Sequence, residues 1–228
     1  MLLLGDGDVL TQSAASTWLF RRDIEIEAAS MFHSMAEAMR RFSWPSALAD
    51  AARQAARDEI HHATLCETLV LSLDPEHTVH EMPDMRKLVF ENEDALLYTA
   101  VSVGCVTESM SAALLLRMRE TTTHSDCKKV VRQVLQDEIG HSRIGWEALR
   151  YCSANRSVRW LYEALPTMCQ SARAEHIEEI GFSGDLSTYG ILTAPEAKAI
   201  LDQTELEVIL PGMRSLIDDN CDERQSLQ

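Results

Sequence analysis

Apolar residues recur at helical spacing over most of the 228-residue chain. The pattern is rarely interrupted, because the chain holds only nine glycines and six prolines. It therefore predicts an all-α protein. Six helices are expected, at residues 13–42, 46–72, 94–120, 125–151, 157–180 and 195–217.

The expected helices fall into two hairpins joined by a long connection. Residues 73–94 contain two prolines and no clean period, which is typical of a crossover that runs along a four-helix bundle. We expect residues 13–151 to form that bundle, with the helices of 152–228 packing on it in the same domain. Residues 181–190 should form a loop, Pro211 should kink or end the last helix, and residues 218–228 read as a polar tail.

Charge and cysteine content narrow the class of protein. The formal net charge of -15 argues against partners such as nucleic acid or an anionic membrane. Six cysteines without CxxC spacing, and no basic and apolar leader, suggest a reduced, cytoplasmic protein. Residues 96–116 could span a bilayer by length, with Glu108 as their only charge. Since no other segment is as apolar, the centre of a bundle is the favoured interpretation.

Two helices carry the same motif. Glu59 and His62 form a Glu-x-x-His pair in the second helix, and Glu138 and His141 form another in the fourth. At this spacing both side chains project from one helical face, so they can reach the same metal ion. Each pair lies on the apolar stripe of its helix. Metal is the best compensation for ionisable groups that point into a core.

The other two helices should each supply one more carboxylate. Glu108 is the only acid in the apolar run of the third helix. In the first helix Glu27 stacks with Phe20, Ile24 and Met31, whereas Glu25 shares its face with two arginines. We therefore choose Glu27 and keep Glu25 in reserve. Glu27 lies 32 residues before Glu59, and Glu108 lies 30 before Glu138, so the two hairpins match.

This set resembles the ferritin-like non-haem di-iron carboxylate proteins, in which two helices carry a Glu and two carry Glu-x-x-His. The resemblance covers residues 13–151 and implies six metal ligands that also act in catalysis: Glu27, Glu59, His62, Glu108, Glu138 and His141. Carboxylates with only two imidazoles favour two iron ions, with manganese as the alternative. The resemblance further implies that Asp58 orients His141 and that Asp137 orients His62.

Within that superfamily the two-histidine set is similar to the oxygen-activating enzymes. The resemblance implies a di-iron oxidoreductase that uses dioxygen to hydroxylate, N-oxygenate or oxidatively cleave a small organic substrate. An external electron donor, such as a ferredoxin or a reductase, would then be a partner. The alternative is a ferroxidase or peroxide-scavenging protein without an organic substrate. The C-terminal helices could cover the bundle, cap a substrate pocket or form a homodimer face.

Overall fold

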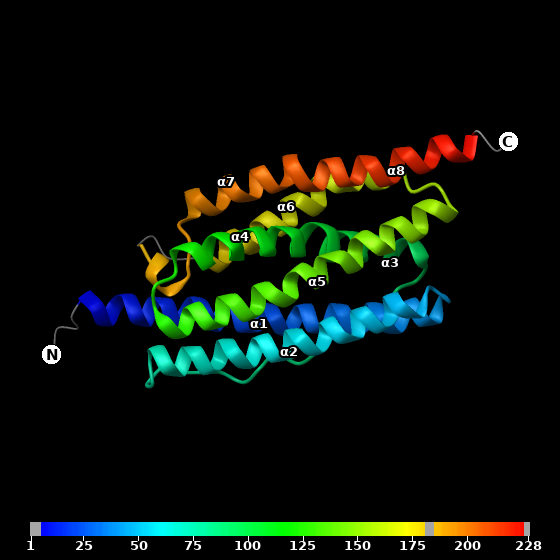
Figure 1. The fold of residues 1–228 in the computed structure, drawn as a ribbon. Helices are drawn as coiled ribbons and strands as arrows, with labels where there is room; N and C mark the ends of the chain where they lie inside the picture. Colours follow the sequence, from blue (N-terminus) through cyan, green and yellow to red (C-terminus); the bar gives the residue numbers. More distant parts are fainter. Residues whose placement is uncertain (1–5, 181–184, 226–228) are drawn as a thin grey trace.

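The computed structural model describes residues 6–180 and 185–225, and this part of the chain is all-helical with no strand (Figure 1). The predicted all-α class is thereby confirmed. The helical elements are α1 (Asp6–Arg41), α2 (Ser46–Leu73), α3 (Glu93–Ala100), η1 (Val101–Thr107), α4 (Glu108–Thr121), α5 (Ser125–Asn155), α6 (Leu161–Ile180), η2 (Ser187–Tyr189), α7 (Ala194–Thr204), η3 (Glu205–Ile209) and α8 (Leu210–Gln225).

The first hairpin consists of α1 and α2, which pack against each other along their length (Figure 1). The turn between them contains Ser43, whose φ of 59° lies in the left-handed region, and Trp44, which is buried. The Trp44 indole donates a hydrogen bond to Glu93 at 3.2 Å and lies 5.6 Å from the Tyr151 ring. The turn thus ties the first hairpin to the second.

Residues 74–92 have no regular structure and run beside α1, as expected of a crossover. Near its start the His80 carbonyl accepts a hydrogen bond from Arg22 at 3.0 Å. Further along, the Leu88 amide donates to the Ser34 hydroxyl at 3.0 Å. Because residue numbers rise together on both segments, the crossover runs parallel to α1 and returns the chain to the end where the second hairpin begins.

The second hairpin pairs the continuous helix α3–η1–α4 with α5, which also packs on α2. Segment η1 is π-helical, and the Glu108 amide that follows it bonds to the Val103 carbonyl five residues back. At this point the backbones of η1 and α5 are in direct contact. A Cβ added to Gly145 would lie only 2.4 Å from the Cys105 nitrogen, and one added to Gly104 would lie 2.6 Å from the Gly145 nitrogen.

The C-terminal helices pack on this second hairpin: α6 on η1, α7 on α4 and α8 on α5. Two expectations for this region need correction. Pro211 does not end the last helix, because α8 follows the π-helical η3 without a break, and the backbone there already departs from regular α-helical hydrogen bonding. Residues 218–225 are helical rather than a tail. Of the expected loop, 181–184 lie outside the described residues, and Gly190 has a φ of 81°.

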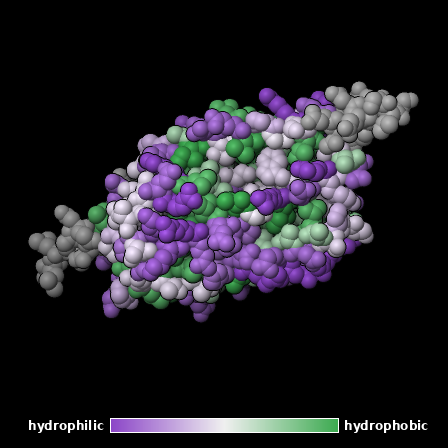
Figure 2. Space-filling view, viewed as in Figure 1, coloured by the Kyte–Doolittle hydropathy of each residue, from purple (hydrophilic) through white to green (hydrophobic). Residues whose placement is uncertain are grey.

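The segment Glu93–Thr121 is the one described helix that is long and apolar enough to cross a membrane. In the structure 61% of its most apolar 18-residue stretch is buried inside the protein. The face shown in Figure 2 is mixed, with hydrophilic residues over most of it and apolar residues between them. Burial among the other helices accounts for the apolar character of this segment, in agreement with the interpretation from the sequence.

Two glycines of α5 provide a matched test of the helix contact. We expect Gly145→Ala to lower the free energy of unfolding by about 1–3 kcal/mol, because the new methyl group forces α5 away from η1. Gly140 is exposed with nothing within 4 Å of an added Cβ, so Gly140→Ala should raise stability by about 0.5–1 kcal/mol. Chemical denaturation measures both. Equal effects of the two substitutions would contradict the close contact.

Candidate metal centre

Six ionisable side chains meet in the interior between the two hairpins. They come from four helical elements, and each is at most 5% exposed. The residues are Glu25 on α1, Glu59 and His62 on α2, Glu108 at the start of α4, and Glu138 and His141 on α5. Because unpaired buried charges are strongly unfavourable, such a gathering needs a compensating cation or retained protons.

The six residues form two overlapping sets, each of which could hold a metal ion. One set is Glu25, Glu59, His62 and Glu138, and the other is Glu59, Glu108, Glu138 and His141. Within each set one ligand atom per residue lies within 4.8 Å of all the others. Glu59 and Glu138 belong to both sets, and each set adds one further glutamate and one histidine. Two neighbouring ions could therefore share the two central carboxylates.

The polar atoms at the centre are poorly satisfied by protein groups. His62 Nδ1 lies 3.0 Å from Glu59 Oε2 and 3.7 Å from Glu25 Oε2. His141 Nδ1 lies 2.8 Å from Glu59 Oε1 without the alignment of a hydrogen bond. Glu59 Oε1, Glu138 Oε2 and His141 Nδ1 are thus buried without a hydrogen-bond partner. Each such unsatisfied atom lowers the stability of the fold by about 1–3 kcal/mol, and coordination to metal would satisfy all three. These residues therefore fit a metal site.

The structure corrects the sequence-based choice on α1. Glu27 is exposed and lies outside both sets, whereas Glu25 is 3% exposed and belongs to one of them. The arginines that made the Glu25 face look polar are themselves buried. Arg21 donates to Glu25 at 2.9 Å, and Arg22 donates to Glu67 at 3.0 Å. Helix α1 packs against α2, α3 and α6, so its buried surface is wider than one apolar stripe.

The aspartate before each motif glutamate contacts the histidine of the opposite helix. Asp137 Oδ2 lies 3.1 Å from His62 Nε2, and Asp58 Oδ2 lies 3.5 Å from His141 Nε2. This pairing matches the one implied by the resemblance. With Nε2 facing an aspartate, each ring presents Nδ1 to the cluster, which is the arrangement that orients a metal-binding imidazole.

The protonation of the cluster reflects crowding of negative charge. Burial and then the charges of Glu138 and Glu25 raise the pKa of Glu59 to about 8. Burial and the charge of Glu138 raise the pKa of Glu108 well above its usual value. Burial lowers the pKa of His62, but its bonds to Glu25 and Glu59 outweigh this and raise that pKa to about 11. Without metal the cluster therefore holds protons, which a divalent ion would displace.

Arg21 sets Glu25 apart from the other carboxylates. Burial raises the pKa of Glu25, but the Arg21 charge and hydrogen bonds to His62 and Glu59 reverse the effect and leave it lowered. Burial likewise raises the pKa of Glu138, but the nearby polar groups of Glu108 and His141 lower it overall. The two carboxylates with a lowered pKa are therefore Glu25, which belongs to one set only, and Glu138, which both sets share.

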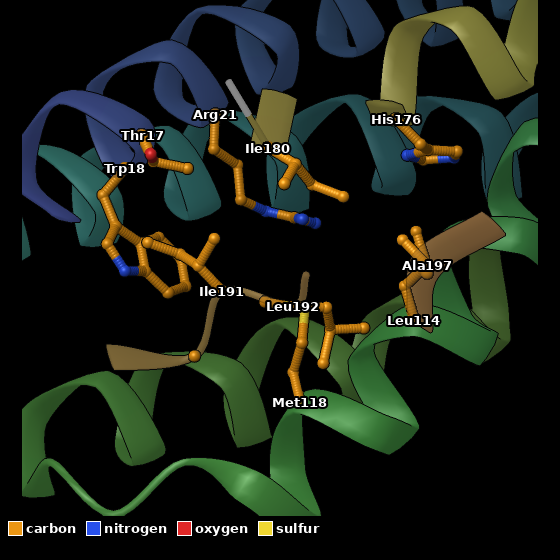
Figure 3. Close-up of a pocket in the computed structure, with 11 residues that line it drawn as sticks. Thr17, Trp18, Arg21, Leu114, Met118, His176, Ile180, Ile191, Leu192 and Ala197 are labelled. Atoms are coloured by element: carbon orange, nitrogen blue, oxygen red, sulfur yellow. The ribbon is translucent and has the colours of Figure 1, made fainter. Parts of the chain in front are cut away.

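A small cavity lies against the carboxylates. It has a volume of about 30 Å³, room for about two water molecules. Its lining includes Arg21 and His176, neither of which the sequence indicated, because both come from outside the repeated motif. The same two residues line a neighbouring apolar pocket of about 20 Å³ (Figure 3). There the Arg21 side chain extends from α1 into the space opposite Leu192, and Trp18 closes one end.

Comparison of the chain with protein-family models, with characterised proteins and with solved structures finds no match. The geometry of the cluster is therefore the main evidence for the function of this protein.

Substitution of the two candidate glutamates of α1 tests which one belongs to the centre. Glu25→Gln should reduce the metal bound by the purified protein, because it removes a buried carboxylate ligand from one set. Glu27→Gln should leave the metal content unchanged, since Glu27 is exposed outside the cluster. Metal content is measured by inductively coupled plasma mass spectrometry, and circular dichroism establishes that both variants fold. Loss of metal in Glu27→Gln alone would reverse the assignment.

Proposed function

We propose that this protein is a ferritin-like four-helix-bundle oxidoreductase with two non-haem iron ions, which react with dioxygen. The observation that carries the proposal is the pair of overlapping ligand sets that share Glu59 and Glu138. Oxygen-rich ligands with one imidazole per ion favour iron or manganese over zinc or copper. Two adjacent ferrous ions would each supply one electron, which together allow the two-electron reduction of dioxygen.

Each group of residues has a distinct part in this proposal. Glu59 and Glu138, which belong to both ligand sets, would be available to both ions, while Glu25 and Glu108 would each serve one. The four glutamates together carry four negative charges when ionised, which two divalent ions balance. Asp58 and Asp137 hold the imidazole rings in orientation through Nε2. Arg21 holds Glu25 by a buried hydrogen bond at 2.9 Å, which limits the movement of that carboxylate relative to Glu108.

Dioxygen fits the cavity beside the carboxylates. The cavity of about 30 Å³ accommodates a molecule of the size of dioxygen, and Ile24, Ala28 and Val103 give it an apolar side that suits a neutral gas. The organic substrate and the external electron donor remain proposals carried by the resemblance. In this form of the function, oxidation of an organic molecule would require additional space next to the centre.

The small cavity also favours a second candidate function, a ferroxidase or peroxide-scavenging protein without an organic substrate. A cavity of about 30 Å³ has room for the oxidant but none for an organic molecule beside it. The two candidates differ in what restores the ferrous state. A ferroxidase turns over added ferrous iron, whereas an oxygenase stops after one cycle until an electron donor reduces it.

Reaction with dioxygen tests the proposal. We expect anaerobically iron-loaded protein to consume dioxygen and show a transient visible absorption in stopped-flow measurements. Glu108→Gln should lose both, because it removes a ligand of one set while keeping the shape of the side chain. Glu27→Gln serves as the control and should behave like the unmodified protein. Dioxygen consumption by Glu108→Gln at the unmodified rate would refute the proposal; repeated turnover of excess ferrous iron would select the ferroxidase.

A further inference from the structure

An open groove lies on the surface of α1 beneath the crossover. Its lining includes Glu27 and Met31 from α1, and Asp84 and Leu88 from the crossover, and its volume is about 530 Å³. The cavity beside the carboxylates is more than tenfold smaller, at about 30 Å³. Met31 lines both spaces, so its partly buried side chain lies where the groove and the cavity beside the carboxylates meet.

The other walls of the cavity are less able to move. Arg21 is fixed by its bond to Glu25 at 2.9 Å, and His176 Nε2 lies 3.4 Å from the Thr107 carbonyl of η1. Both separate the cavity from the apolar pocket of about 20 Å³ rather than from the groove. Methionine is unbranched, flexible and without a strong hydrogen-bonding group, so Met31 can change rotamer at little cost.

We propose that Met31 is the specificity-determining gate through which a small neutral molecule, such as dioxygen, reaches the cluster from the groove. The inference depends on the proposed function for the identity of that molecule. The charges along the route are mixed, because Arg86 lies in the groove with Glu27 and Asp84, and Arg21 lines the cavity with its glutamates. The apolar side of the cavity, formed by Ile24, Ala28 and Val103, is what suits a neutral species. Molecules larger than a diatomic are held back by the volume behind Met31.

Binding of nitric oxide tests the gate apart from turnover, because nitric oxide is a neutral diatomic that binds ferrous iron. In stopped-flow measurements on anaerobic iron-loaded protein, Met31→Trp should slow binding by about tenfold, and Met31→Ala should accelerate it. Met31→Ala should also speed removal of iron by a ferrous chelator, since it widens the route for larger molecules. Leu88→Ala is the matched control: it alters the groove but not the cavity, and should leave both rates unchanged.

Iron content and circular dichroism are measured for every variant, so that a change in rate is separated from loss of the centre. If Met31→Trp fails to fold, the two rates of Met31→Ala decide the matter. Unmodified rates of nitric oxide binding in both Met31 variants would overturn the gate. Slow binding in Met31→Trp, together with no dioxygen consumption by the unmodified protein, would preserve the gate and refute the proposed function.

Discussion

The structure depends on one electrostatic constraint: four glutamates are buried within a few ångströms of one another in a helical core. Carboxylates at such separations cannot all be ionised in a medium of low dielectric constant without a compensating charge. Among the residues that the structure describes, Arg21 provides a guanidinium within hydrogen-bond distance, and it serves Glu25. The raised pKa values of Glu59 and Glu108 express the same constraint in the metal-free protein. Two divalent ions would balance the negative charge of the four carboxylates.

The backbone is arranged to place these groups. Gly104 and Gly145 lie one helical turn from Glu108 and His141, respectively, and their contact sets the separation of α4 and α5 at the cluster. The π-helical η1 ends directly before Glu108, so its wider turn fixes the direction in which α4 begins. On the outer side, the crossover and α6 cover α1 and η1. Met31 is one of the partly buried residues on this side of the carboxylates, and it also lines the groove beneath the crossover.

Much of this arrangement follows from periodicity in the sequence. The helices of both hairpins and the crossover can be predicted because apolar spacing and proline placement are local signals. The motif residues Glu59, His62, Glu138 and His141 can be predicted because they repeat on apolar stripes. The pattern favours Glu27 over Glu25 because buried arginines resemble a polar face in sequence, and three-dimensional packing is needed to show that Arg21 and Arg22 are interior. The π-helical turn, the Gly104–Gly145 contact and the role of Met31 depend on neighbours distant in sequence, so no local pattern indicates them.

The central claim is that two metal ions share Glu59 and Glu138. Anomalous diffraction from crystals of the iron-loaded protein, recorded at the iron absorption edge, tests it most directly. We expect two peaks about 3.5–4 Å apart, one beside His62 and Glu25 and the other beside His141 and Glu108. An iron-loaded crystal with no peak in the cluster, or with a single ion outside both ligand sets, would contradict it.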